Sequence, residues 1–326
     1  MASEKSNAQK VASVWSRLFN PLRSLTKTQI ERMVEDMHHG DDVRAQLVFS
    51  EIEAQSDIYH LCIDKRVAGV LGREWDVLPT DETPEARRQA EKVKKVLEES
   101  DMRNEDGLTQ ALSHLVLSAF RGRAVVKPFF TEDGRLFFKN LENWNVLQWN
   151  GRLYWNPSSE PVGWFDDSIP DGVTELPIDE VCALFSQRPI DVPGLLIYLR
   201  MLVGENNWSR FIEKQGIPQI LLTVPEGTPD EALDQWNWRA KSLYEGGSGA
   251  MPYGSKCDVL DSARGQDPFS EYLRHQREAI CILAVGGSLN VLGGATGLGS
   301  NLADVQQQAF NSLVNADCKR ISNAVT

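Results

Sequence analysis

Apolar residues recur three or four positions apart through the early part of the chain, and this spacing predicts a series of helices. A short helix is expected over Thr28–Gly40, and apolar positions between Asp41 and Leu71 predict two more around Asp57. Thr83–Ser100 is predicted to be a helix because Thr83 can cap it and Pro84 suits its first turn. Val93, Val96 and Leu97 would form its apolar stripe, and an amphipathic helix is expected over Leu108–Phe120.

The pattern then changes to short runs with strand character that are separated by turn residues. Trp75–Leu78 is predicted to be an isolated strand. Arg123–Thr131 and Arg135–Asn140 flank the turn residues Glu132-Asp133-Gly134, which predicts a hairpin. Asn143–Trp149 and Arg152–Asn156 flank Asn150-Gly151, the strongest two-residue hairpin signal. Residues 75–156 are therefore expected to form an α+β region with a largely antiparallel sheet.

The second half of the chain alternates long helices with short strands and glycine-rich segments. An acidic, proline-punctuated stretch contains one predicted strand, Val181–Ser186. A β-α-β unit is predicted between two helices, and a long helix follows a glycine-rich linker. The expected elements are the helix Leu195–Gln215, the strand Ile217–Val224, a helix from Thr228 to about Tyr244, the strand Lys256–Leu260, the helix Asp267–Leu283, the linker Gly286–Ser300 and the helix Asn301–Val325.

Composition narrows the class of protein. The chain has 326 residues, 41% hydrophobic and 25% charged, which is ordinary for a globular protein of two or three domains. The formal net charge of −12 argues against a generally basic nucleic-acid binder. The five cysteines form no CxxC pair, so no zinc site is expected, and their odd number favours a reducing compartment. The longest apolar run, Ala279–Val285, is far shorter than the roughly 18–20 residues of a membrane span.

Two features offer possible contacts with phosphate. Gly293–Ser300 is glycine-rich and precedes a helix, where backbone amides can hold an anion. It lacks the lysine of a P-loop and follows a predicted helix rather than a strand, so a flexible loop is the favoured interpretation. Arg274 and Arg277 lie three residues apart on one helix, where they could meet phosphates or pair with Glu271 and Glu278.

The remaining candidates favour structural roles. A group of aromatic residues could stack on bases, but it lacks interleaved lysine and arginine, and sheet packing is the better interpretation. This group comprises Trp144, Trp149, Tyr154, Trp155 and Trp164. The histidines are expected to be structural, and the acidic pairs Asp166-Asp167 and Asp179-Glu180 are expected to be solvated or capping residues. We find no catalytic constellation, metal site or cofactor site, so an enzyme is not expected.

Several stretches, taken in order, carry a resemblance to a known family. They are Ser56–Val77, Leu136–Trp149, Asn207–Pro218, Val224–Pro229 and Gly293–Gln308. The third stretch contains W-x-x-F-x-E-x-x-G-x-P, from Trp208 to Pro218. Together they resemble the portal proteins of tailed bacteriophages, in the Mu-like branch, over roughly residues 45–325.

This resemblance implies a portal-type α+β architecture with named parts. It implies an antiparallel-sheet wing, two stem helices around a β-α-β clip, and a tunnel loop followed by a long helix. The parts would be an N-terminal arm (1–44), the wing (45–194), the first stem helix (195–216), the clip (217–264), the second stem helix (265–285), the tunnel loop (286–300) and the helix that returns to the wing (301–326).

The resemblance also implies a function. The chain would form a homo-oligomeric ring, a dodecamer, at one capsid vertex, through which double-stranded DNA is packaged and ejected. Expected partners are the terminase large subunit, the major capsid or scaffolding protein and a head-tail adaptor, without a membrane. The ring would assemble in the host bacterial cytoplasm and reside in the virion. Few cations on a channel wall would let DNA slide, because each phosphate contact with lysine or arginine strengthens binding.

The residues that would carry this role fall into three groups. The tunnel loop would use Gly293, Gly294, Thr296, Gly297, Gly299 and Ser300, and the stem would present Arg274 and Arg277 to the DNA backbone. Clip contacts with partners would involve Trp236, Trp238, Tyr244 and Tyr253, although whichever of the two tryptophans faces inward would serve packing. A nucleotide-binding enzyme that uses 293–300, or a non-portal adaptor, are the alternatives.

Family members generally continue beyond the position where this sequence stops. The part not present would include the end of the wing and the crown. A truncated form, a partial gene or a degenerate prophage copy is therefore expected.

Overall fold

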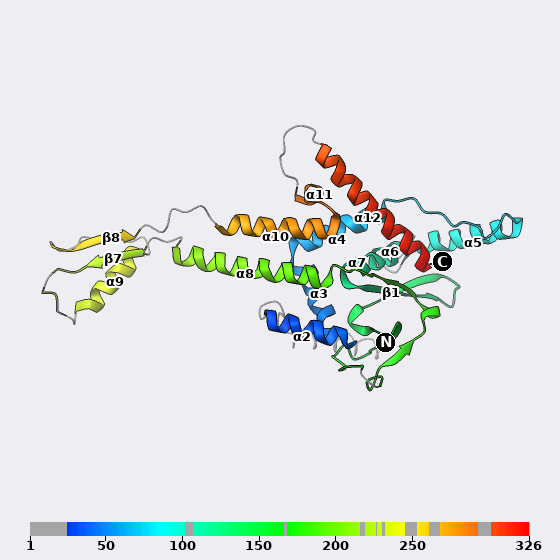
Figure 1. The fold of residues 1–326 in the computed structure, drawn as a ribbon, viewed down its shortest axis with the longest axis horizontal. Helices are drawn as coiled ribbons and strands as arrows, with labels where there is room; N and C mark the ends of the chain where they lie inside the picture. The colour runs from blue at the N-terminus through cyan, green and yellow to red at the C-terminus, as the bar shows by residue number, and fades with distance from the viewer. Residues whose placement is uncertain are drawn as a thin grey trace. The chain divides into compact units, whose positions relative to one another are not determined.

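The computed structural model describes most of the chain (Figure 1). The described residues are 25–101, 107–165, 168–215, 219–225, 227–229, 232–244, 253–260, 268–292 and 301–325. They divide into two compact units. Unit 1 consists of the described parts of 1–199 and 277–326, and unit 2 of those of 200–276. The predicted arm at 1–24 lies outside the described residues.

Helices provide most of the regular structure in the described residues, as the spacing of apolar positions predicts. The helices are α2 (Lys27–His38), α3 (Val43–Gln55), α4 (Asp57–Leu71), α5 (Pro84–Asp101), α6 (Leu108–Val116), α7 (Ser118–Arg121), α8 (Asp191–Gln215), α9 (Leu233–Tyr244), α10 (Pro268–Val285), α11 (Leu289–Leu292) and α12 (Asn301–Val325). Two short 3-10 helices, η1 (Asn143–Asn145) and η2 (Ile178–Glu180), complete the set.

The strands are short and pair antiparallel throughout the described residues. They are β1 (Arg123–Phe130), β2 (Leu136–Leu141), β3 (Val146–Trp149), β4 (Arg152–Trp155), β5 (Thr174–Leu176), β6 (Cys182–Phe185), β7 (Gln219–Thr223) and β8 (Lys256–Leu260). The sheets have the orders β2-β1-β6, β3-β4-β5 and β7-β8. An α+β class with largely antiparallel sheets is therefore confirmed.

Local sequence explains how the elements of unit 1 begin and end. Thr26 and Gln29 form a reciprocal capping box at the start of α2. The extended backbone of Ser56 separates α3 from α4, and its hydroxyl accepts a hydrogen bond from the amide of Tyr59. Asn150 and Gly151 both have positive φ, 48° and 75°, as a tight hairpin turn between β3 and β4 requires.

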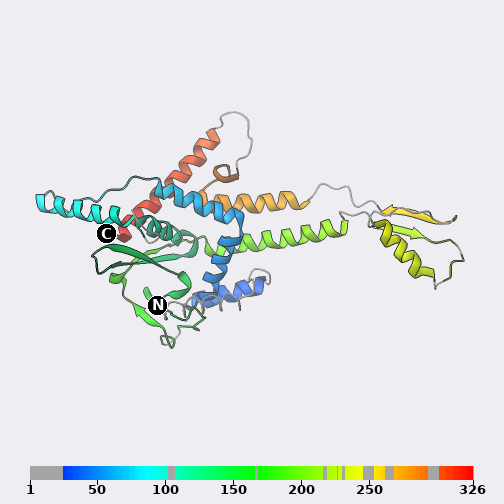
Figure 2. The same ribbon diagram turned by 180° about the vertical axis from the view of Figure 1, so that it is seen from behind.

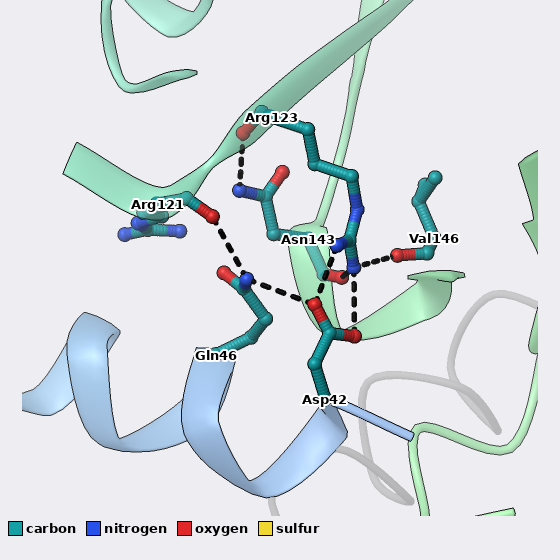
Figure 3. Close-up of polar contacts among 6 residues, drawn as sticks. All are labelled: Asp42, Gln46, Arg121, Arg123, Asn143 and Val146. Atoms are coloured by element: carbon teal, nitrogen blue, oxygen red, sulfur yellow. Dashed lines mark hydrogen bonds and ion pairs between the residues drawn. The ribbon is translucent and has the colours of Figure 1, made fainter. Parts of the chain in front are cut away.

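A buried polar centre attaches α3 to the central strand of the first sheet (Figure 3). The Asp42 carboxylate accepts hydrogen bonds from the guanidinium of Arg123, one at 2.9 Å, and from the amide of Gln46 at 3.1 Å. Arg123 also donates to the carbonyl oxygens of Asn143 and Val146, and the Asn143 amide returns a bond to the Arg123 carbonyl. The centre therefore connects α3, β1 and the start of β3 through charge-assisted bonds.

Two clusters of buried apolar residues occur in unit 1. One gathers Val43 and Leu47 of α3 with buried aromatic residues of the second sheet region. These aromatics are Trp144, Tyr154 and Phe165, with Trp149 packed against them. Trp164 is 44% exposed and stacks on His39 with ring centroids 4.0 Å apart. Packing is thus the observed role of these aromatic residues, except for Trp164, which lies at the surface.

Unit 2 consists of the β7-β8 pair, α9, and the adjoining ends of α8 and α10. The two strands pair antiparallel from Gln219↔Leu260 to Thr223↔Lys256, so the unit is not a β-α-β unit in the usual parallel sense. Phe211 of α8 and Phe269 of α10 pack with ring centroids 5.6 Å apart. Gly204 leaves room for the ring of Tyr272, because a Cβ there would lie 3.0 Å from it.

The structure corrects several boundaries and one element. Trp75–Leu78 forms no strand, and Leu78 is 81% exposed, because the described residues offer it no neighbouring strand. The predicted stripe on α5 is not a core face, since Val93 is half exposed and Ser100 is the buried residue of this helix. The helix expected from Leu195 begins at Asp191, and the one expected from Thr228 begins at Leu233. Strand β5 was not predicted, because three mostly polar residues carry no periodicity.

Candidate functional site

The predicted loop residues follow α11 in the sequence and precede α12. Gly293, Gly294, Thr296, Gly297, Gly299 and Ser300 themselves fall outside the described residues. The chain enters this segment through α10 and α11 and leaves it through α12. In both views α12 and the end of α10 meet α4 (Figures 1 and 2). The described part of the candidate site therefore consists of the contacts that hold these flanking helices in place.

Arg66 of α4 contacts both flanking helices at once. Its guanidinium donates to both carboxylate oxygens of Asp317 on α12, at 2.6 and 3.1 Å, and to the carbonyl oxygen of Ala284 on α10 at 3.0 Å. The side chains of Arg66 and Asp317 are 8% and 5% exposed. A paired and hydrogen-bonded charge can be buried at this depth, whereas an unpaired one is strongly unfavourable. We call the three residues Arg66, Ala284 and Asp317 the Arg66 anchor.

Close packing supports the Arg66 anchor on the α12 side. A Cβ at Gly69 would lie 2.7 Å from Val314 and 3.0 Å from Phe310, so a glycine is needed for α12 to approach α4. Lys65 places its ammonium 5.8 Å from the centre of the Phe310 ring. Arg320 of α12 also donates to the carbonyl oxygen of Phe185, which attaches the helix to strand β6. Helix α12 is thus held at several points along its second half.

On the α10 side a glycine ends the helix before the predicted loop. Gly286 has φ of 76°, and its amide donates to the carbonyl oxygen of Ile282 at 3.1 Å. This is the left-handed residue that commonly follows the last helical turn. Helix α11 then occupies Leu289–Leu292, so the segment Gly286–Ser300, expected to be a linker, contains a short helix. A dinucleotide fold requires a strand before its glycine-rich turn, and the element observed here is a helix.

The two predicted arginines of α10 differ in their surroundings. Arg277 pairs with Asp57 at the start of α4, with 2.7 Å between guanidinium and carboxylate. Arg274 is exposed and its guanidinium lies 4.0 Å from the carboxylate of Glu271. Arg277 thus forms an ion pair within unit 1, and each of the two arginines has a carboxylate next to it.

The four aromatic residues predicted for partner contacts also divide. Trp236 is buried, and the Arg239 guanidinium lies 4.9 Å from the centre of its ring. Trp238 is 71% exposed and borders a depression together with Asp234, Gln235 and Arg239. Tyr253 is fully exposed, whereas the side chain of Tyr244 lies outside the described residues. Trp236 therefore packs inward and Trp238 faces outward, which resolves the alternative that the sequence left open.

The histidines among the described residues have structural surroundings. His114 is buried between α6 and the first sheet, and burial together with the nearby Arg121 guanidinium lowers its pKa to about 4. His60 lies 3.3 Å from Asp64 on the surface of α4. No group of three or more potential metal ligands occurs among the described residues. None of the described helices is long and apolar enough to cross a membrane.

Sequence reasoning did not identify the Arg66 anchor. Arg66 and Asp317 are separated by 251 residues, and each looks like an ordinary charged residue within a helix. Only the position of Arg66, where the pattern of α4 expects an apolar residue, could have drawn attention to it.

Comparison with known proteins gives one family match and several structural matches. A profile described as "Portal protein of Mu bacteriophage" matches residues 46–326. A curated relative, the Mu-like prophage FluMu protein gp29 of Haemophilus influenzae Rd, is 23% identical over 319 residues. That alignment covers 94% of this chain but only 60% of the relative, so the chain spans less than two thirds of that protein's length.

Two solved structures share the fold. One is titled as the neck of an empty gene transfer agent particle, with a TM-score of 0.56 and 12% identity. The other is titled as the neck of the native particle computed with C12 symmetry, with a TM-score of 0.55 and 13% identity. Each match covers 90% of this chain and 79% of the solved chain. At this level of identity the likeness shows a common fold.

Proposed function

The chain belongs to the Mu bacteriophage portal protein family, and we propose on this basis that it is a subunit of a phage portal. In this role it forms a ring at one vertex of the capsid, and double-stranded DNA passes through the ring during packaging and ejection. The observation that carries the proposal is the family match over residues 46–326. The fold shared with chains of gene transfer agent necks supports it.

One of these necks was computed with C12 symmetry, and on this basis we propose a ring of twelve copies. The proposed partners are the terminase large subunit, a capsid or scaffolding protein and a head-tail adaptor. The ring would assemble in the host cytoplasm and remain in the virion. The portal is a structural component, so the hydrolysis that drives packaging belongs to the motor that docks on it.

We further propose which parts of the chain perform which task. The sheets and the surrounding helices of unit 1 would be the wing, α8 and α10 the stem helices, and β7, α9 and β8 the clip. Residues 286–300 would be the tunnel loop. The Arg66 anchor supports this assignment, because it fixes both helices that flank the loop to α4. Forces exerted by DNA on the loop would then be transmitted to the wing.

The depression beside Trp238 is the best supported candidate for partner contacts in the clip. Tryptophan and arginine are both enriched among the residues that contribute most binding energy in protein interfaces. Trp238 is 71% exposed and Tyr253 is fully exposed, whereas Trp236 is committed to packing. We therefore assign the docking of motor or adaptor to Trp238 and Tyr253 rather than to Trp236.

A ring can be tested directly on purified protein. Light scattering would give the mass in solution, and negative-stain images of the same fraction would show its shape. We expect particles of about twelve times the 36.6 kDa chain mass with a central hole. A species that stays monomeric over a wide range of protein concentration would overturn the proposal that this chain forms the ring by itself.

A second experiment tests the loop assignment separately from assembly. The four glycines of residues 293–300 would be replaced by alanine, which removes conformational freedom from the loop, with the Trp238→Ala variant as a comparison. We expect both variants to form rings in a packaging assay, with the loop variant defective in DNA retention and the tryptophan variant defective in motor or adaptor binding. Normal packaging by the loop variant would remove the tunnel role from this segment.

A further inference from the structure

Helix α4 and the last part of α10 run in the same direction and contact each other in unit 1 (Figure 2). At one end Asp57 pairs with Arg277 at 2.7 Å, and at the other Arg66 donates to the carbonyl oxygen of Ala284 at 3.0 Å. Residue numbers rise together along both helices, as parallel neighbours require. The middle of this contact is therefore fixed from both ends.

Two cysteine thiols occupy the middle of the contact. Cys62 of α4 and Cys281 of α10 are both 0% exposed, and their side chains are hydrogen-bonded to each other. Both are free thiols in the structure. The other cysteines, Cys182, Cys257 and Cys318, are partly exposed. Two thiols in contact on neighbouring helices are the arrangement from which a disulfide can form.

The two thiols are not equivalent in acidity. The hydrogen bond donated by Cys62 lowers the pKa of Cys281, and the same bond together with burial raises the pKa of Cys62. Arg277, one turn before Cys281, also favours its thiolate. Because the thiolate is the nucleophile in thiol–disulfide exchange, Cys281 is the residue expected to react first.

We propose that Cys62 and Cys281 are an oxidisable pair that forms a disulfide and thereby cross-links α4 to α10. The oxidant is a small-molecule disulfide such as oxidised glutathione. The Cys281 thiolate attacks one sulfur of the oxidant, forms a mixed disulfide and releases one small thiolate. Cys62 then gives its proton to the released small thiolate and attacks the Cys281 sulfur, which forms the protein disulfide and releases the second small thiolate. Two protein thiols are oxidised, and one small disulfide is reduced to two thiols.

The consequence is that the covalent link between α4 and the end of α10 forms or breaks with the redox conditions around the protein. A reducing cytoplasm keeps the pair as thiols, and an oxidising medium outside the cell closes it. The closed form would fix α10 to α4 through a covalent bond in addition to the Arg66 anchor. This inference rests on contacts within unit 1 and does not depend on the proposed portal function.

Peptide mapping under non-reducing conditions tests the proposal. The full chain would be incubated with oxidised glutathione, blocked with an alkylating agent and digested. We expect a linked peptide pair that contains Cys62 and Cys281, with the other three cysteines recovered alkylated or as mixed disulfides. The mixed disulfides of the partly exposed cysteines show that the oxidant was active. Cys257→Ala is the matched control and should leave the linked pair unchanged.

Several outcomes would overturn the proposal. One is recovery of Cys62 and Cys281 as alkylated thiols while the partly exposed cysteines have reacted. Another is a linked pair that involves Cys182 or Cys318 in place of either one.

In the Cys62→Ala variant, the proposal predicts that Cys281 accumulates as a mixed disulfide with glutathione. Because the main test uses the unaltered chain, it remains decisive even where a cysteine variant fails to fold.

Discussion

Removal of one member of the Arg66 anchor should destabilise unit 1 far more than removal of a surface ion pair. In Asp317→Leu, the buried Arg66 guanidinium keeps the Ala284 carbonyl at 3.0 Å and loses both carboxylate bonds. Breaking a buried pair in this way costs about 3–5 kcal/mol, and we expect a value near the upper end. In Arg66→Met, Asp317 retains Arg320 with a nitrogen 3.8 Å from its carboxylate, so a loss near about 3 kcal/mol is expected.

The double variant Arg66→Met/Asp317→Leu separates the cost of an unpaired charge from the value of the pair. With both charges removed no buried ion is left alone, so the double variant should be more stable than Asp317→Leu by about 3–5 kcal/mol. Urea unfolding followed by far-ultraviolet circular dichroism gives the free energies. Hydrogen exchange of peptides from α12 shows whether the loss is located there.

The exposed pair Arg152–Glu175 is the matched control. Its side chains are 65% and 49% exposed with 3.3 Å between charged atoms, so Arg152→Gln should cost less than about 1 kcal/mol. The reasoning would be refuted if the anchor variants behaved like this control. It would also be refuted if the double variant lost the sum of the two single losses, because the charges would then not depend on each other.

Three further predictions concern other parts of the chain. The pKa of His114 is lowered from 6.5 to about 4, so between these pH values the folded state binds fewer protons than the unfolded state. The contribution of His114 to the free energy of unfolding is therefore complete above about pH 6.5 and should fall by about 3 kcal/mol toward pH 4. Urea titrations across pH should show this loss for the native chain and not for His114→Phe. Gly69→Ala places a Cβ 2.7 Å from Val314, so overpacking should cost about 1–3 kcal/mol and lower the thermal midpoint. Trp236→Ala should lower the free energy of unfolding of unit 2 by about 3 kcal/mol, whereas substitution of the exposed residue in Trp238→Ala should change this free energy by less than about 0.5 kcal/mol. Denaturant titrations measure both, and equal effects would show that the assignment of Trp236 as inward and Trp238 as outward is wrong.

The sequence predicted those elements whose local pattern is sufficient to define them. The break between α3 and α4 at Ser56 and the hairpin turn at Asn150-Gly151 each follow from a few adjacent residues. Strand character at Trp75–Leu78 did not produce a strand, because a strand needs a neighbour and none of the described strands lies beside it. The unpredicted β5 shows the converse, since pairing with β4 makes a strand of three residues with no pattern.

The candidate site was predictable to a smaller extent than the fold. The glycine-rich segment could be identified from the sequence itself, whereas the aromatic residues of unit 2 were expected only from the resemblance to portal proteins. The contacts that hold the flanking helices join residues such as Arg66 and Asp317, which are 251 positions apart. Nothing in one sequence distinguishes a buried arginine from a solvated one, because burial is decided by the packing of α4, α10 and α12 together.

The position of the Arg66 anchor separates two requirements that a loop in a DNA channel would have to meet. A loop that changes conformation needs residues with little preference of their own, and the glycine content of 293–300 supplies them. Freedom in the loop must not loosen the helices on either side of it. One guanidinium that binds both the end of α10 and the middle of α12 satisfies this second requirement without any contribution from the loop. The stability of unit 1 should therefore be insensitive to substitutions in 293–300 and sensitive to substitutions at Arg66, whatever the loop contacts.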